Sequence, residues 1–116
     1  MLNQMETPGF DTFRRSDNFT LTEVRQEPVI YRNVYIIWRG MATNVTVTDE
    51  HTRFDFLVGY DTRRTLEGIV PVIFDRPVAI NSERPLEVLA KIVLFGPNFD
   101  IRLEGVAIHQ SGRLEE

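Results

Sequence analysis

The 116-residue chain contains no cysteine, only two histidines and a single lysine. Without cysteine it can form no disulfide, zinc–thiolate site, iron–sulfur cluster or thiol nucleophile. No apolar run approaches the roughly 18 residues that a transmembrane helix requires. The glycines are single and dispersed, so no phosphate-binding loop is predicted.

Positive charge is also scarce, since the net charge is −4. A protein that neutralises many phosphates needs a basic stripe, and the overall balance does not supply one. The sequence still allows a local basic patch, because Arg63 and Arg64 precede one predicted strand and Arg76 and Arg84 lie in the loop after it.

Catalytic and metal-binding patterns are equally sparse. His51 falls in a polar turn, His109 falls at a strand end, and no serine lies in a Gly-x-Ser-x-Gly setting. Asp49, Glu50 and Asp55 surround His51, but their spacing matches no EF-hand or zinc motif. We therefore expect no enzyme activity, no cofactor and no metal site.

The composition, 42% hydrophobic and 26% charged, is typical of a single folded domain. We expect a flexible N-terminal tail over residues 1–17, where polar residues, proline and glycine give no clean period. The domain itself is predicted over residues 18–110, and a frayed C-terminal tail over residues 111–116.

Hydrophobic residues alternate with polar ones from residue 18 onward, which indicates strands. A short strand is predicted over Phe19 to Val24, because Phe19 and Leu21 alternate with threonines. A long strand follows between Val29 and Asp49. Its hydrophobic phase changes near Gly40, which predicts a bulge or sharp bend there and a strand that serves two regions of sheet.

Two further strands are predicted in the middle of the chain. Phe54 to Tyr60 alternates as a half-buried strand, and Ile69 to Phe74 is apolar on both faces. Pro71 has no N–H, so this second strand should have a free edge or a bulge there. Residues 75–85 are predicted to form a loop, with room for a short strand over Val78 to Ile80.

The C-terminal part predicts a hairpin. Residues 86–94 and 99–104 show the alternation of strands on either side of a Gly-Pro-Asn turn at residues 96–98. Residues 85–93 are also rich in helix formers, and a helix is the alternative there. A second phase change predicts a bulge near Gly105.

These elements predict an all-β fold, a five-stranded OB-like Greek-key barrel with an extra N-terminal strand or tail. From Ile37 to His109 the chain resembles small bacterial OB-type domains. The resemblance is carried by the segments WRG at 38–40, FLVGY at 56–60, EGIVPV at 67–72 and PLEVLA at 85–90. The chain departs from the periplasmic OB-type haem chaperone, because no aromatic residue follows His109 in the tail.

The absence of a reactive constellation favours a non-catalytic binding or assembly module that engages a protein partner or itself. The candidate partner-binding residues are Phe19 and Leu21 on the N-terminal strand and the arginines Arg63, Arg64, Arg76 and Arg84. A single-stranded nucleic-acid-binding domain is one alternative, and a small-ligand carrier or enzyme is another. The resemblance favours the bacterial periplasm or cell envelope over the cytoplasm.

Overall fold

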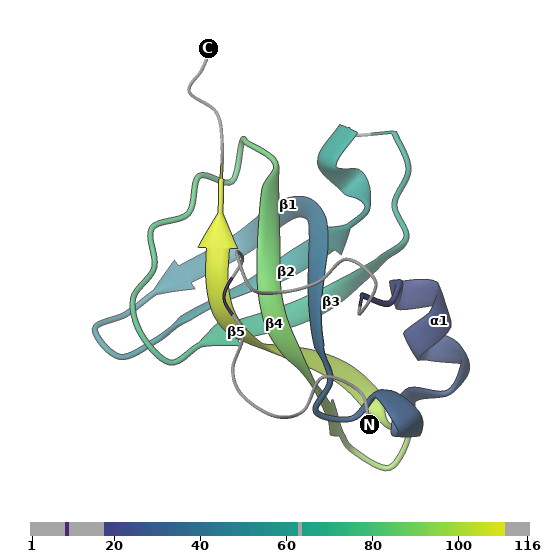
Figure 1. Cartoon of the computed structure of the whole chain (residues 1–116). Helices are drawn as coiled ribbons and strands as arrows, with labels where there is room; N and C mark the ends of the chain where they lie inside the picture. Colours follow the sequence, from purple (N-terminus) through teal and green to yellow (C-terminus); the bar gives the residue numbers. More distant parts are fainter. Residues whose placement is uncertain (1–8, 10–17, 63, 111–116) are drawn as a thin grey trace.

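The computed structural model describes residues 9, 18–62 and 64–110 (Figure 1). The predicted tails, apart from Gly9, lie outside the described residues. In chain order the elements are helix α1 (Leu21–Gln26), the 3-10 turn η2 (Pro28–Tyr31), β1 (Tyr35–Val47), β2 (Thr52–Val58), the 3-10 turn η3 (Tyr60–Thr62), β3 (Gly68–Phe74), β4 (Leu86–Phe95) and β5 (Asp100–His109).

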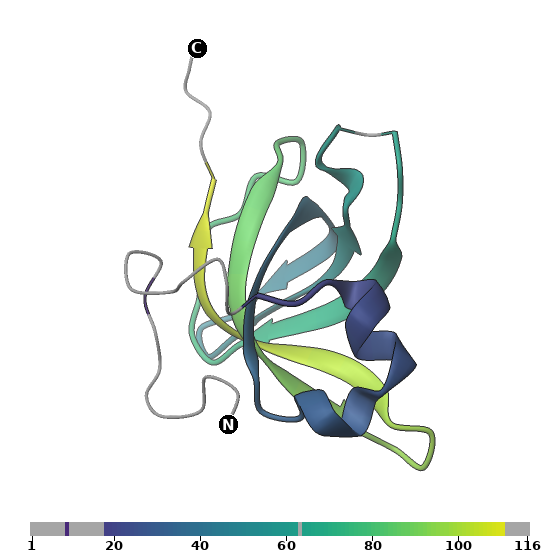
Figure 2. The ribbon, with the colours of Figure 1, turned by 45° about the vertical axis from the view of Figure 1, so that its right-hand side comes forward.

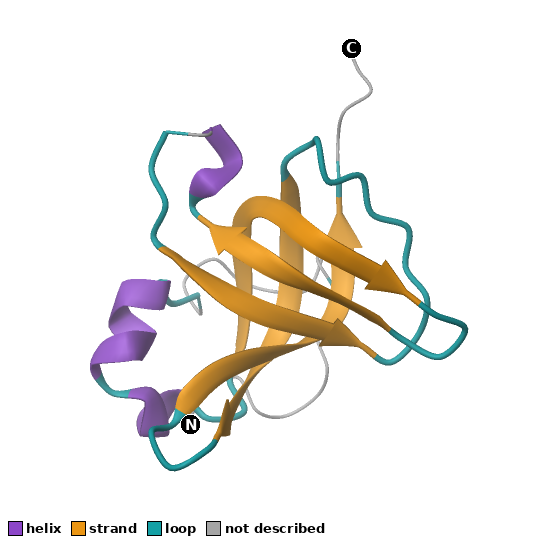
Figure 3. Cartoon of the chain, turned by 180° about the vertical axis from the view of Figure 1, so that it is seen from behind, coloured by secondary structure: helices purple, strands orange, loops and turns teal. Residues whose placement is uncertain are grey.

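The five strands close into a barrel in the order β1-β2-β3-β5-β4 (Figures 1 and 3). All neighbouring strands are antiparallel except β3 and β5, which are parallel. The first part of β1, Tyr35–Gly40, pairs with β4, and the second part, from Gly40 to Val47, pairs with β2. The predicted all-β barrel and the long strand that serves two regions of sheet are both confirmed.

Gly40 is the point at which β1 changes partner, since it pairs with Val58 on one side and Leu86 on the other. A Cβ atom at this position would overlap the carbonyl oxygen of Leu57, so the close approach requires glycine. Of the bulge or sharp bend predicted at Gly40, the bulge is not found there. The register shifts further along, between Thr43 and Thr46, where Asn44 adopts a left-handed φ of 55°.

The second predicted bulge is confirmed. Ala90 pairs with Gly105 but the preceding Leu89 pairs with Ala107, so Val106 is the extra residue of β5. The ring of Phe74 occupies the space where a side chain at residue 105 would lie. The bulge therefore curves β5 over the end of β3, as a small barrel requires.

The predicted N-terminal strand is wrong, because residues 21–26 form α1. Thr20 caps the helix by accepting a hydrogen bond from the backbone N–H of Glu23, whose carboxylate accepts from the N–H of Thr20 in return. This is a capping box. Leu21 and Val24, three residues apart, share the face that packs on the barrel, and both are buried.

The interior is filled by inward-facing residues of all five strands together with the buried face of α1. The largest fully buried side chains include Phe56 and Phe74. Residues 86–95 form the strand β4, so the helical alternative for this segment is wrong. Residues 78–80 form no strand, although Val78 and Ile80 pack against the core.

The loop after β3 is fixed by Thr52, a fully buried polar residue. Its hydroxyl donates to the carbonyl oxygen of Arg76 at 3.0 Å and accepts from the N–H of Val78 at 2.8 Å. Both hydrogen-bonding roles of the hydroxyl are satisfied, so its burial carries no penalty for an unpaired group.

We predict that Gly40→Ala destabilises the barrel by about 3 kcal/mol, because the new methyl group must displace the backbone of β2. Gly96→Ala is the matched control. Gly96 has a positive φ, and a Cβ atom there would meet the Asp100 carboxylate at an ordinary contact distance of 3.7 Å, so this variant should lose only about 1 kcal/mol. Urea unfolding measures both changes, and equal losses would contradict the tight approach at Gly40.

We predict that Leu21→Ala costs about 3 kcal/mol, because α1 is part of the core and the substitution leaves a cavity. Thr22→Ala, on the exposed face of the same helix, should change the free energy of unfolding by less than about 0.5 kcal/mol. A Leu21→Ala variant as stable as Thr22→Ala would show that α1 does not contribute to the folded barrel.

Candidate binding groove between β3 and β5

The strand β3 is only half paired on one of its two edges. It pairs with β2 along its whole length, from Gly68 to Phe74. On its other edge only Val72 and Ile73 pair with β5. Residues 68–71 have no strand partner there among the described residues. The free edge predicted at Pro71 is confirmed.

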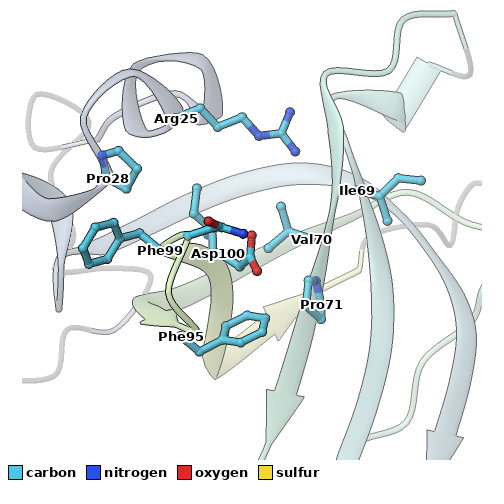
Figure 4. A pocket seen from close by; sticks show the side chains of 10 residues that line it. Arg25, Pro28, Ile69, Val70, Pro71, Phe95, Phe99 and Asp100 are labelled. Carbon is cyan, nitrogen blue, oxygen red and sulfur yellow. The ribbon is translucent and has the colours of Figure 1, made fainter.

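The strands β3 and β5 diverge towards α1 (Figure 2), and a hollow of about 500 Å³ lies there (Figure 4). Its walls are the open half of β3, the turn between β4 and β5, and the helical segment formed by α1 and η2. We call it the β3–β5 groove. It is lined by Arg25, Pro28, Ile69, Val70, Pro71, Phe95, Asn98, Phe99, Asp100 and Ile101.

The groove exposes aromatic surface. Phe95 at the end of β4 is 42% exposed and Phe99 in the turn is 45% exposed. Figure 4 shows Phe95 extending towards Pro71, while Phe99 lies below Pro28. Exposed apolar side chains grouped around a hollow are typical of binding sites rather than of ordinary surface.

Phe99 also has an unusual backbone. Its φ is 54°, in the left-handed region, and its N–H donates to the carbonyl oxygen of Gly96 to close the turn. Glycine and asparagine adopt this conformation at low cost, whereas it is rare for a bulky side chain. The exposed phenylalanine is therefore not the residue that the turn alone would favour, which is a feature of functional positions.

Two charged side chains face each other across the groove without an ion pair among the described residues. Arg25 extends from the last turn of α1 towards β3, and its Nη1 donates to the carbonyl oxygen of Glu67 at 3.3 Å (Figure 4). Its guanidinium lies over Gly68, where a Cβ atom would collide with it. Asp100 is exposed on the opposite wall, at the start of β5.

The two apolar residues predicted to bind a partner do not lie on a free surface. Leu21 is 1% exposed in the core. Phe19 packs edge-on against Tyr31, with ring centroids 5.0 Å apart, and its carbonyl oxygen accepts from the Trp38 indole N–H at 2.6 Å. Phe19 and Leu21 alternate with threonines because a helix N-cap at Thr20 is followed directly by α1, not because they lie on a strand. Both residues attach α1 to the barrel.

The described members of the predicted arginine set are not gathered into one basic rim. Arg64 is exposed in the connection before β3, and Arg63 lies outside the described residues. Arg76 comes after β3, so the strand, roughly 20 Å long, separates it from Arg64. Arg76 donates to the carbonyl oxygen of Val106, and the carbonyl of Arg84 accepts from Gln110 near the end of β5.

The outer face of β2 and β3 lacks a stacking platform. Phe54, Phe56 and Phe74 all point inward and are buried. The outward positions of the two strands hold Arg53, Asp55, Leu57, Ile69, Pro71 and Ile73, none of them aromatic. Binding of single-stranded nucleic acid on this face would lack the base-stacking contribution that such sites use.

The polar residues around His51 form a turn. His51 belongs to a tight hairpin turn that Thr48 holds by accepting from the N–H groups of Glu50 and His51. In the part of the chain that the structure describes, no three acidic or histidine side chains are grouped as metal ligands. None of the helices described there is long and apolar enough to span a membrane.

A second hollow, of about 290 Å³, lies beside the start of α1. The side chain of Asn18, one of its lining residues, is already engaged. The side-chain amide of Asn18 donates to the carbonyl oxygen of Ile37 at 2.8 Å and accepts from its N–H at 3.0 Å. Asn18 thus takes the place of a neighbouring strand beside β1, and we regard this hollow as part of the fold.

A closed five-stranded barrel with this strand order and a parallel β3–β5 contact defines the OB-fold class. The family model described as Spirochaete C-terminal OB fold matches residues 13–109. The chain therefore belongs to this family of OB-fold domains. No curated protein is significantly similar to the chain in sequence.

Apart from Pro71, the sequence pattern does not point to the residues that line the groove. Alternation groups Phe99 with Ile101 and Leu103 on an inward face, but the left-handed backbone at Phe99 removes it from that alternation. The predicted strand over residues 19–24 gives Arg25 no role, because Arg25 is carried by a helix. The capping-box pattern of Thr20 and Glu23 was the available signal for that helix.

We predict that Phe99→Asn raises the free energy of unfolding by about 0.5 kcal/mol, because asparagine tolerates the left-handed backbone. Phe95→Asn is the matched control in an ordinary strand conformation, and it should lose about 1 kcal/mol of stability. Thermal and urea unfolding measure both effects. A similar loss in the two variants would mean that the turn is not strained at Phe99.

Proposed function

We propose that this domain is a non-catalytic binding module that engages a protein partner through the β3–β5 groove. The observation that carries the proposal is the exposed aromatic surface of Phe95 and Phe99, one of them held in an unfavourable backbone conformation. Aromatic residues are enriched where protein interfaces are energetically important. An exposed ring kept at some cost to stability is best explained by a contact that a partner supplies.

The charged groups of the groove support binding rather than catalysis. General acid–base or nucleophilic chemistry requires reactive groups within hydrogen-bond reach of one another. Arg25 and Asp100 form no ion pair with each other, and the remaining lining residues are apolar apart from Asn98. Such a set is suited to recognising a ligand of mixed apolar and charged character.

A display selection tests the proposal. A random short-peptide library is selected on the full chain, and the affinities of the enriched peptides are measured on Phe99→Asn. We expect binding to weaken at least about tenfold, as at a central interface aromatic. Val47→Asn is the matched control, because Val47 is 49% exposed on β1 and does not line the groove. It should bind as the natural chain does.

The proposal would be overturned by a selection that enriches no peptide, or by peptides that bind Phe99→Asn as tightly as the natural chain. A parallel titration with mixed-sequence single-stranded oligonucleotides, followed by fluorescence anisotropy, addresses the alternative function. Binding that persists at physiological salt and is unchanged in Phe99→Asn would favour a nucleic-acid-binding role over the groove.

A further inference from the structure

We propose that the segment bound in the groove is an extended peptide that adds to the barrel as a strand along Gly68–Pro71 of β3 and places an acidic side chain against Arg25. This inference rests on the proposed function and specifies its ligand. It adds two features that the aromatic surface of the groove does not by itself require. The first is hydrogen bonding to the backbone of β3, and the second is an ion pair with Arg25.

The backbone argument begins with the unpaired edge. Each residue of a strand carries hydrogen-bonding groups, and an edge without a neighbour leaves part of them available to another chain. Here the open edge of β3 forms one wall of a hollow of about 500 Å³. An exposed edge beside a side-chain pocket is the arrangement that strand-adding peptides recognise.

Pro71 restricts how such a peptide pairs. Proline has a carbonyl acceptor but no N–H, so at this residue β3 can accept a hydrogen bond but cannot donate one. A peptide beside it must therefore supply donors there, and a proline in the facing position would lose the bond. The register of an added strand would thus be limited by β3 itself.

The charge argument concerns Arg25. The chain carries an excess of acidic residues, yet no carboxylate of a described residue lies within ion-pair distance of this guanidinium. Its one described hydrogen bond, to the carbonyl oxygen of Glu67, leaves further N–H donors without a partner among the described residues. Arginine is well suited to bind a carboxylate through two parallel hydrogen bonds. A partner's aspartate or glutamate would complete this arrangement.

Side-chain alternation connects these two arguments. Successive residues of an added strand face opposite sides, so every second side chain of the peptide would point towards Phe95, Phe99 and Pro28. We therefore expect the recognised segment to combine alternate apolar residues with one acidic residue at the end beside α1. Asp100 on the opposite wall would disfavour a second acidic residue next to the turn.

The role of the Arg25 charge is tested by reversing it and then reversing the charge of the peptide residue that faces it. The tightest peptide of the display selection is synthesised, and its affinity is measured by calorimetry on the natural chain and on Arg25→Glu. We expect a loss of at least about tenfold, and recovery when the peptide's acidic residue is replaced by lysine. Arg64→Glu is the matched control, since it makes the same charge change at an exposed residue outside the groove. Arg25→Gln, which keeps a long polar side chain, should also weaken binding.

The backbone role is tested by a scan in which each peptide N–H in turn is methylated. Strand addition predicts that methylation abolishes binding at every second position and is tolerated between them, because only alternate N–H groups face β3. Amide exchange at Ile69 should slow on binding, because its N–H faces the same edge as Pro71, whereas Gly68 and Val70 face β2.

The outcomes distinguish the two proposals. A flat methylation scan, or equal losses in Arg25→Glu and Arg64→Glu, would overturn the strand-adding acidic peptide but leave a groove-dependent binding module in place. Peptides insensitive to Phe99→Asn would overturn both. A concentration-dependent dimer of the chain alone, abolished by Phe99→Asn in sedimentation measurements, would assign the groove to a second copy and overturn the peptide.

Discussion

The barrel is closed by a very short contact, the parallel pairing of Val72 and Ile73 with Leu103 and Glu104. Every other pair of neighbouring strands has a longer register. Parallel pairing cannot extend to Pro71 with a full set of bonds, because proline lacks the donor. The strands therefore separate at one end, and two consequences follow: the interior needs a cover, and the open edge of β3 forms a wall of the groove.

Helix α1 supplies part of that cover. Its buried face, Leu21 and Val24, joins the core, while Arg25 on its last turn lies over the start of β3. The groove is thus a direct result of how the barrel closes, since its walls are the helix, the unpaired half of β3 and the turn that begins β5. The bulges in β1 and β5 also shape the barrel, because they supply the curvature by which these strands wrap around a small interior.

The barrel could be predicted from the sequence because its signals are local. Alternation fixed the positions of β2, β3 and β4 to within one or two residues, and the phase change near Gly105 located a real bulge. The hydrophobic pattern also shows the phase change in β1, but it points to Gly40 as the irregular residue. The irregular residue is Asn44, whose short polar side chain tolerates the left-handed backbone and donates to the carboxylate of Asp55 at 2.9 Å.

The groove could not be predicted in the same way, because it depends on contacts between distant segments. Arg25 and Gly68 are far apart in sequence, and only the closed fold brings the guanidinium over the glycine. Of the arginines that the sequence suggests, Arg64 lies before β3 whereas Arg76 and Arg84 lie after it. Alternation along the chain carries no information about which end of a barrel a loop occupies. Helix α1 was mistaken for a strand because Phe19 and Leu21 also fit a period of two over so short a segment.

The groove differs from other parts of the molecule in whether the residue types agree with the backbone conformation and the contacts at their positions. At several positions elsewhere they agree: Thr20 caps a helix, Thr52 has both its hydrogen bonds, and Gly40 lies where no side chain fits. At the groove they do not, because an aromatic residue occupies a left-handed position and a guanidinium has no carboxylate among the described residues. A folded domain tolerates such departures at functional sites, where another molecule completes the interactions. That contrast within one small barrel is the physical reason for placing its binding surface between β3 and β5.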